Sequence, residues 1–161
     1  MSNQSISVDN LSEKEVEWLA LQRGLARELV GIFTECVCED PPTVEDLEIT
    51  FNKYMAHFLY PPRKGLLRKK NLIIDPNAFV LSIGTALGDC IVANTMLEWI
   101  VITDEFGTDI GLYAPGVAGQ YSDIVTHPMN LTAKRFESRT TNWMEDVYTS
   151  LIDEIQRMQN S

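Results

Sequence analysis

The chain has 161 residues, 45% of them hydrophobic, and a formal net charge of −10 at pH 7. This composition is too apolar for a disordered chain, and we expect a single domain, residues 1–161, with a substantial core. The excess of carboxylates disfavours nucleic-acid binding, because phosphate contacts require clustered Lys and Arg. It fits plain solvation, or a protein partner with a basic surface.

Two further features bear on location. An odd number of cysteines, Cys36, Cys38 and Cys90, in a chain long enough to fold without disulfides favours reduced thiols. The first ten residues are polar and contain no basic segment followed by an apolar one, so no signal peptide is expected. We therefore predict a cytoplasmic protein.

Two helices are predicted in the N-terminal part, residues 1–75. Ser12 and Glu15 have the spacing of a capping box and open a helix that runs to about Cys36. Two prolines stop it, and Thr43, with Asp46 three residues later, opens a second helix with one apolar face. The pair is typical of a helical hairpin.

The segment that follows holds a basic cluster within residues 63–70, consisting of Arg63, Lys64, Arg68, Lys69 and Lys70. It could bind a phosphate or an acidic partner, but no glycine-rich cradle accompanies it. A solvated linker that offsets nearby carboxylates is the simpler interpretation. Residues 72–74 could form a short strand.

A long central helix is predicted from Pro76, capped by Asp75, to about Met96. Gly84 and Gly88 lie four residues apart on one face, so a neighbouring backbone could approach closely there. Residues 78–102 are long enough to cross a bilayer. Because they include Asp89, Asn94 and Glu98, they are more typical of the core helix of a soluble protein, and we expect no membrane contact.

Asp89 is the one charged residue within this predicted helix. A buried carboxylate is costly without a partner, so Asp89 either faces solvent or meets a donor such as Lys134 or Arg135. With His127, these residues could also form a functional pocket.

A β-hairpin is predicted next, with strands on either side of the turn Asp104-Glu105-Phe106-Gly107. A third strand over residues 123–126, a short helix that exposes Lys134 and Arg135, and a last helix capped by Asn142 with Glu145 complete the chain. The fold class is therefore α+β: an N-terminal helical hairpin, a long central helix, a small antiparallel three-stranded sheet and a C-terminal helix, with residues 76–137 as the core and 138–161 as the last helix.

The hairpin turn is the best candidate for a binding site. Asp104, Glu105 and Asp109 could bind a hard cation, but their spacing does not match a calcium loop, and Asp and Gly are ordinary turn residues. We therefore expect no metal and no cofactor. Phe106 at the tip either folds back onto the sheet or is offered to a partner.

Several segments in succession carry a resemblance to a known family: Gly84-x-x-x-Gly88-Asp89, then residues 98–109, then Pro128 followed by residues 134–137. Over about Phe79 to Glu137, the chain resembles the bacterial family catalogued as domain of unknown function 3806. The resemblance implies a compact α+β module without an assigned activity, and it supplies no catalytic residues.

We expect a non-catalytic protein-binding module that uses Phe106 and its acidic rim, Asp104, Glu105 and Asp109, to hold a basic partner. The alternative is a small hydrolase, with or without a metal, in which Asp89, Asp104 and His127 act together. Trp18 and Leu21 widen the apolar stripe of the first helix, so a homodimer is a further alternative.

Overall fold

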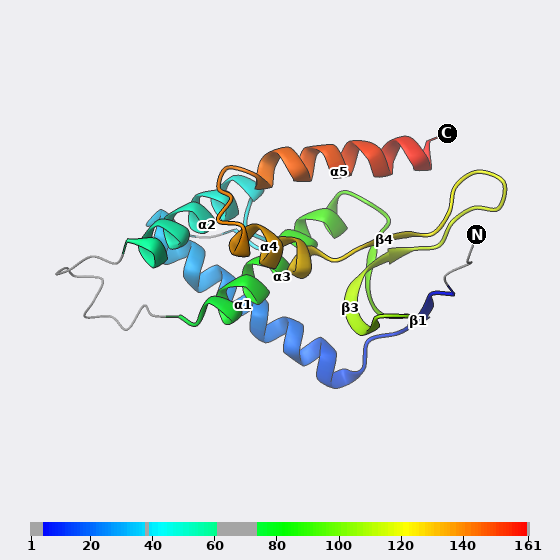
Figure 1. The fold of residues 1–161 in the computed structure, drawn as a ribbon, viewed down its shortest axis with the longest axis horizontal. Coiled ribbons are helices and arrows are strands. Elements are labelled where there is room, and N and C mark those ends of the chain that lie inside the picture. Colours follow the sequence, from blue (N-terminus) through cyan, green and yellow to red (C-terminus); the bar gives the residue numbers. More distant parts are fainter. Residues whose placement is uncertain (1–4, 38, 61–73, 161) are drawn as a thin grey trace.

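A computed structural model describes residues 5–37, 39–60 and 74–160. The described elements are five helices and a four-stranded antiparallel sheet, which confirms the α+β class. In chain order they are β1 (Ser7–Asp9), α1 (Glu13–Thr34), α2 (Val44–Leu59), α3 (Pro76–Ala93), β2 (Glu98–Asp104), β3 (Gly107–Ala114), β4 (Ile124–Thr126), α4 (Pro128–Glu137) and α5 (Met144–Gln159). Figure 1 shows the sheet at one end of the molecule and α2 at the other.

The sheet has the strand order β1-β2-β3-β4, so the prediction of three strands was wrong by one. β1 is only three residues long and pairs with the outer edge of β2, with Val8 opposite Ile102. A strand this short, with polar residues on both sides of one valine, has no recognisable pattern in the sequence. β1 forms because its backbone pairs with the edge of β2.

The predicted starts of the first two helices are confirmed. The Ser12 hydroxyl accepts the backbone N–H of Glu15 at 3.3 Å, and the Glu15 carboxylate accepts the backbone N–H of Ser12 at 2.8 Å. The Thr43 hydroxyl accepts from the backbone N–H of Asp46 at 3.1 Å. These bonds satisfy amide groups that have no partner within the helix. The predicted basic linker and most of the suggested strand at 72–74 lie outside the described residues.

α3 is the central helix and packs against α1, α2 and α4. It begins at Pro76, as predicted, and ends at Ala93, three residues before the predicted end. By length and composition it is the one helix in the described ranges that could cross a membrane, and 61% of it is buried inside the fold. Its buried side chains join one hydrophobic cluster that extends from α1 to α5.

The two glycines of α3 mark close approaches, as predicted. A Cβ added at Gly84 would lie 2.6 Å from the Cα of Met129, at the start of α4. A Cβ added at Gly88 would overlap the indole ring of Trp99. The missing side chain at Gly84 therefore lets the backbone of α4 lie directly on α3, whereas the missing side chain at Gly88 makes room for the indole of Trp99.

The predicted cap of the last helix was wrong. Asn142 has a left-handed backbone (φ 55°), and its side-chain oxygen accepts from the Asn52 amide at 2.8 Å instead of capping α5. The first turn of α5 is capped from α2, because the Glu48 carboxylate accepts the backbone N–H of Glu145 at 2.6 Å. A cap supplied by another helix cannot be read from the local sequence.

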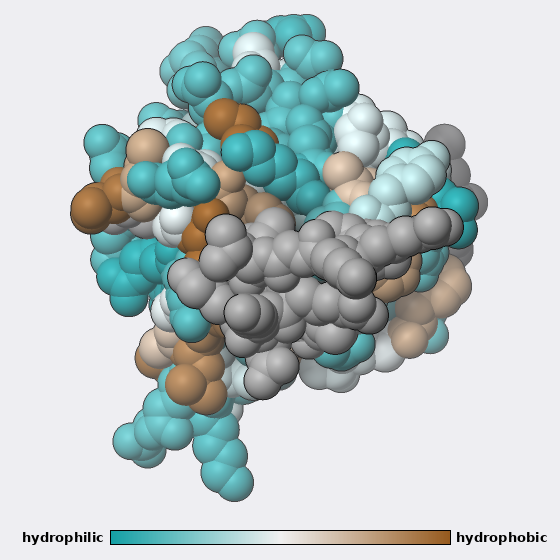
Figure 2. Space-filling view, turned by 90° about the vertical axis from the view of Figure 1, so that its left-hand side faces the viewer, coloured by the Kyte–Doolittle hydropathy of each residue, from teal (hydrophilic) through white to brown (hydrophobic). Residues whose placement is uncertain are grey.

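Hydrophobic side chains on the surface are scattered on at least one face. In Figure 2, the brown residues among the described atoms form small separate groups between teal ones. Such scattering is ordinary for the surface of a folded protein.

Candidate functional site

A pocket of about 350 Å³ lies between the tip of the β2–β3 hairpin and the first turn of α4. We call it the tip pocket. Its lining residues are Ile102, Asp104, Phe106, Gly107, Thr108, Asp109, His127 and Asn130. The volume is at the small end of the range of ligand pockets. Three of the four residues predicted to form the binding tip therefore line one cavity.

The hairpin turns through Glu105 and Phe106, because Asp104 pairs with Gly107. One carboxylate oxygen of Asp104 accepts the backbone N–H of Phe106 at 2.8 Å, and Gly107 has a positive φ of 133° that favours glycine. The Phe106 side chain is 87% exposed. Of the two sequence-based alternatives, the ring is thus directed to solvent and does not fold back onto the sheet.

Asp109 connects the hairpin to α4. One oxygen of its carboxylate accepts the backbone N–H of Ile110 at 2.8 Å, and the other accepts from the Asn130 amide at 3.2 Å. Ile102, which lies opposite Asp109 in the sheet, is only 2% exposed. The tip pocket therefore has an apolar residue at its base and two carboxylates whose positions are fixed by backbone hydrogen bonds.

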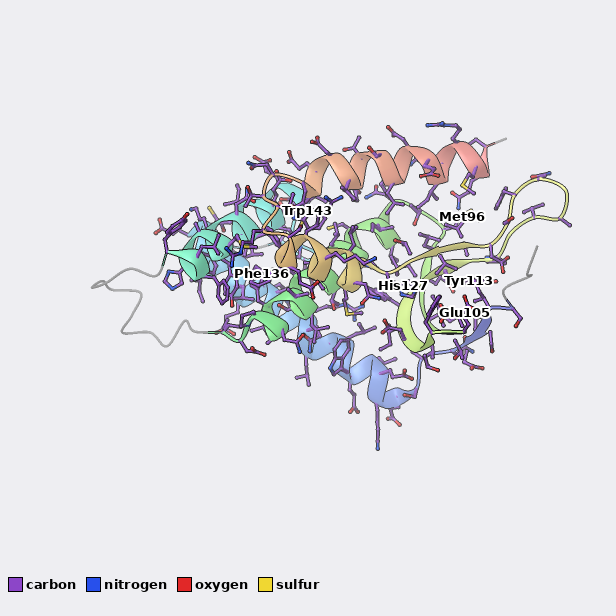
Figure 3. All side chains as sticks on the ribbon, viewed as in Figure 1. Met96, Glu105, Tyr113, His127, Phe136 and Trp143 are labelled. Atoms are coloured by element: carbon purple, nitrogen blue, oxygen red, sulfur yellow. The ribbon has the colours of Figure 1, made fainter. Side chains whose placement is uncertain are left out.

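His127 follows β4 and stands at the N-cap of α4. The pairing of Leu112 with Thr126 puts His127 beside Gly111, and a Cβ added at Gly111 would lie 2.8 Å from its Nδ1 atom. Within the described part of the chain, this buried Nδ1 has no hydrogen-bond partner. The imidazole thus fills the space that a side chain at Gly111 would take, and Figure 3 shows the label of His127 close to that of Tyr113 in β3.

Asp89 lies outside the tip pocket, and neither predicted donor reaches it. Its carboxylate forms a two-bond ion pair with Arg23 of α1, with Nε–Oδ2 at 2.7 Å and Nη2–Oδ1 at 3.0 Å. The Trp99 indole N–H donates to Oδ1 at 2.9 Å. The hydrogen bond with Asp89 raises the pKa of Arg23. Arg23 was missed because it is 66 residues from Asp89, and no local spacing connects them.

The suggested pocket of Asp89, His127, Lys134 and Arg135 is not assembled. Lys134 is exposed on α4, and the Arg135 guanidinium lies 5.9 Å from the centre of the Trp143 ring, a cation–π contact. Of these four residues, only His127 lines the tip pocket. The three residues of the hydrolase alternative are likewise not all in one place, because Asp104 and His127 line the tip pocket and Asp89 does not.

The tip pocket is acidic. Its lining holds two carboxylates and no Lys or Arg, so it favours a cationic group over an anion. Over the described ranges, no group of three or more His, Cys, Asp and Glu side chains is arranged to hold a metal ion. Ile102, Thr108 and Asn130 line the pocket but were not among the site residues predicted from the sequence. Asn130 could have been suspected, because it lies in the first turn of the helix that begins directly after His127.

The surface suggested for self-association is partly exposed. Leu21 on α1 is 72% exposed, whereas Trp18 is half-buried. The described structure includes no second copy, so self-association stays a prediction.

Comparisons with curated proteins and with solved structures found no match. A family model matches residues 67–148, about half of the chain, and extends beyond both ends of the resemblance seen in the sequence. The match includes every residue that lines the tip pocket and leaves out α1 with Arg23. The chain therefore belongs to the family described as Domain of unknown function (DUF3806).

Proposed function

We propose that this chain is a cytoplasmic, non-catalytic binding protein that holds a basic protein partner with the β2–β3 tip. The observation that carries the proposal is the exposed ring of Phe106 in the turn of the hairpin, which lines the tip pocket together with Asp104 and Asp109.

Burial of an exposed aromatic ring and electrostatic attraction both favour a partner at this tip. Phe106 is 87% exposed, so it leaves a large apolar surface in contact with water. Burial of that surface against a partner is favourable. Aromatic residues are enriched among those that dominate binding energies. The surrounding carboxylates and the net charge of −10 attract a basic surface over several ångströms and speed association.

The experiment is affinity capture from a lysate of the native host, followed by mass spectrometry. It compares the wild type with Phe106→Ala and with Met96→Ala, which removes another exposed hydrophobic side chain at the opposite end of β2. We expect a partner that the wild type and Met96→Ala retain and that Phe106→Ala loses. Identical captures by all three proteins contradict the proposal.

One observation favours the hydrolase as a second candidate: Asp104 and His127 line the same cavity. A carboxylate and an imidazole in one pocket can act as a general acid and base. The test is a hydrolase substrate screen with and without added divalent metals. Turnover that is lost in both His127→Ala and Asp104→Asn supports this candidate, and absence of turnover under all conditions counts against it.

A further inference from the structure

Resting on the proposed function, we propose that the tip pocket binds the side chain of one arginine residue of the partner protein. Phe106 lies at its rim and Ile102 at its base, and Asp104 and Asp109 supply its two negative charges. The chemistry of each part fits a guanidinium on an apolar stem.

The two carboxylates have a spacing that suits a guanidinium. Asp109 lies opposite Ile102 in the sheet, and Asp104 is two residues further along β2 on the same face. Diagonal neighbours of this kind lie about 7–8 Å apart. Gly107, opposite Asp104, has no side chain, so the space between the carboxylates stays open. A guanidinium has five N–H donors in a planar fork and can donate to both sides.

The carboxylates are held in place before a ligand arrives. Each has one oxygen bonded to a backbone N–H at 2.8 Å, that of Phe106 for Asp104 and that of Ile110 for Asp109. Acceptors fixed in this way lose little freedom on binding, which increases affinity. Each carboxylate keeps further lone pairs for an incoming donor.

The lining of the tip pocket includes no Lys or Arg that would neutralise this charge. Two arginines elsewhere in the described structure are engaged away from it: Arg23 is paired with Asp89, and Arg135 lies over the Trp143 ring. A phosphate or other anion at the start of α4 would meet repulsion from both carboxylates. The described side chains offer no three-ligand metal site. The excess negative charge is thus matched best by one organic cation.

The apolar parts of the tip pocket favour arginine over lysine. The exposed face of Phe106 can stack on a planar guanidinium, which is weakly hydrated, whereas a lysine ammonium is a compact and strongly hydrated charge. Ile102 at the base provides apolar contact for the methylene stem. We therefore expect arginine to bind more tightly than lysine.

The experiment is an NMR titration of the ¹⁵N-labelled full chain with capped amino acids. The probes are N-acetyl-arginine amide, N-acetyl-lysine amide and N-acetyl-citrulline amide, in which a neutral urea replaces the guanidinium at almost the same shape. We expect arginine to shift the amide signals of Gly107, Thr108 and Asn130. Lysine is expected to bind more weakly, and citrulline about tenfold or more weakly, because the charge is lost. Equal binding of arginine and citrulline, or tighter binding of lysine, overturns the inference.

Two variants test the site itself. In Asp104→Asn/Asp109→Asn, each amide keeps an oxygen that can accept the backbone bond, and we expect arginine to bind about tenfold or more weakly. Asp153→Asn on the exposed face of α5 removes a charge elsewhere and is expected to bind like the wild type. Unchanged binding by the folded double variant contradicts the proposal. If the double variant does not fold, the comparison of arginine with citrulline on the wild type decides it.

A further probe separates a side chain from the free metabolite. Free arginine carries an α-ammonium and an α-carboxylate, which a residue inside a chain lacks, and the α-ammonium offsets the repulsion between the α-carboxylate and the acidic pocket, so we expect it to bind no more tightly than the capped form. Tighter binding of free arginine overturns the assignment to a partner's side chain. If no arginine probe shifts the pocket signals while capture still depends on Phe106, this inference fails and the proposed function stands. If arginine binds as expected but capture does not depend on Phe106, the proposed function fails and the pocket assignment stands.

Discussion

Arg23 and Asp89 are 66 residues apart in the sequence and form a two-bond ion pair that joins α1 to α3, at 2.7 and 3.0 Å. The Asp89 side chain is 17% exposed and that of Arg23 is 35% exposed. Trp99 donates a third hydrogen bond to the same carboxylate, so three elements meet at one charge. This pair anchors α1, which lies outside the matched family region, to the helix at the centre of the fold.

Removing one member of this pair is expected to destabilise the protein. Arg23→Met keeps most of the stem but leaves Asp89 with Trp99 as its one remaining described donor, which should cost about 1–3 kcal/mol of unfolding free energy. The measurement is urea unfolding at pH 7. The double variant Arg23→Met/Asp89→Leu should recover part of the loss, because no buried charge is left without a partner. If the loss in the double variant equals the sum of the losses in Arg23→Met and Asp89→Leu, the two side chains are not energetically coupled.

Gly84→Ala is expected to destabilise α3 against α4. The new methyl group would lie 2.6 Å from the Cα of Met129, and a backbone atom cannot move aside easily. Overpacking of this kind costs about 1–3 kcal/mol, more than the roughly 1 kcal/mol that Ala gains over Gly in a helix. Gly24→Ala in α1 is the matched control, since its Cβ would meet no atom within 4 Å. The control should stabilise the protein in thermal or urea unfolding. A stabilising Gly84→Ala would contradict the close packing.

Cys90 is expected to make the free energy of unfolding decrease as the pH rises in the alkaline range. Burial raises the pKa of its thiol to about 12, with a further contribution from the negative charge of Asp89, against an ordinary value of 9.0. Its contribution to stability is therefore fully present below pH 9 and is lost as the pH rises from 9 towards 12. Each pH unit in this window costs about 1.4 kcal/mol, because the unfolded thiol ionises first.

The check is urea unfolding at pH 8 and pH 10. The wild type should lose about 1.4 kcal/mol more than Cys90→Ala between these values. Cys36→Ala, which removes an exposed thiol, should keep the slope of the wild type. Equal slopes in the wild type and Cys90→Ala would mean that the thiol is accessible to ionisation in the folded state.

Glu48 is expected to contribute to the stability of α5 from another helix. Its carboxylate accepts the N–H of Glu145 at 2.6 Å, and its negative charge lies at the positive end of the α5 dipole. Glu48→Ala should therefore cost about 0.5–2 kcal/mol, as the loss of an N-cap does. Glu48→Gln should cost less, since its amide oxygen still accepts the bond. Hydrogen exchange in the first turn of α5 is the direct readout, and unchanged exchange in Glu48→Ala would contradict the cap.

Much of the fold was predictable, because it depends on short-range signals. The capping box at Ser12, the cap at Thr43 and the proline at the start of α3 each act within about one helical turn. The hairpin also depends on short-range signals, since the Asp104 carboxylate and Gly107 set the turn between two strands that contain β-branched residues. The glycines of α3 indicated a close approach, but not that Met129 and Trp99 make it.

The candidate site was predictable only in part. The tip residues Asp104, Phe106 and Asp109 follow from the hairpin, which the sequence itself specifies. That His127 and Asn130 lie beside them depends on the pairing of β4 with β3, and therefore on how the chain returns to the sheet. Unless the pairing of β4 with β3 is known, the tip residues could equally form an acidic turn with no pocket beside it.

The sequence by itself determined the α+β class, most helix starts and the position of the hairpin turn, because these depend on hydrogen bonds and periodicity over a few residues. Only the tertiary structure decided four features: the fourth strand, the pairing of Asp89 with Arg23, the capping of α5 by Glu48, and the tip pocket. Each of these depends on groups brought together from distant parts of the chain. The physical reason is that burial and pairing of such groups depend on the packing of whole elements, which no local spacing encodes.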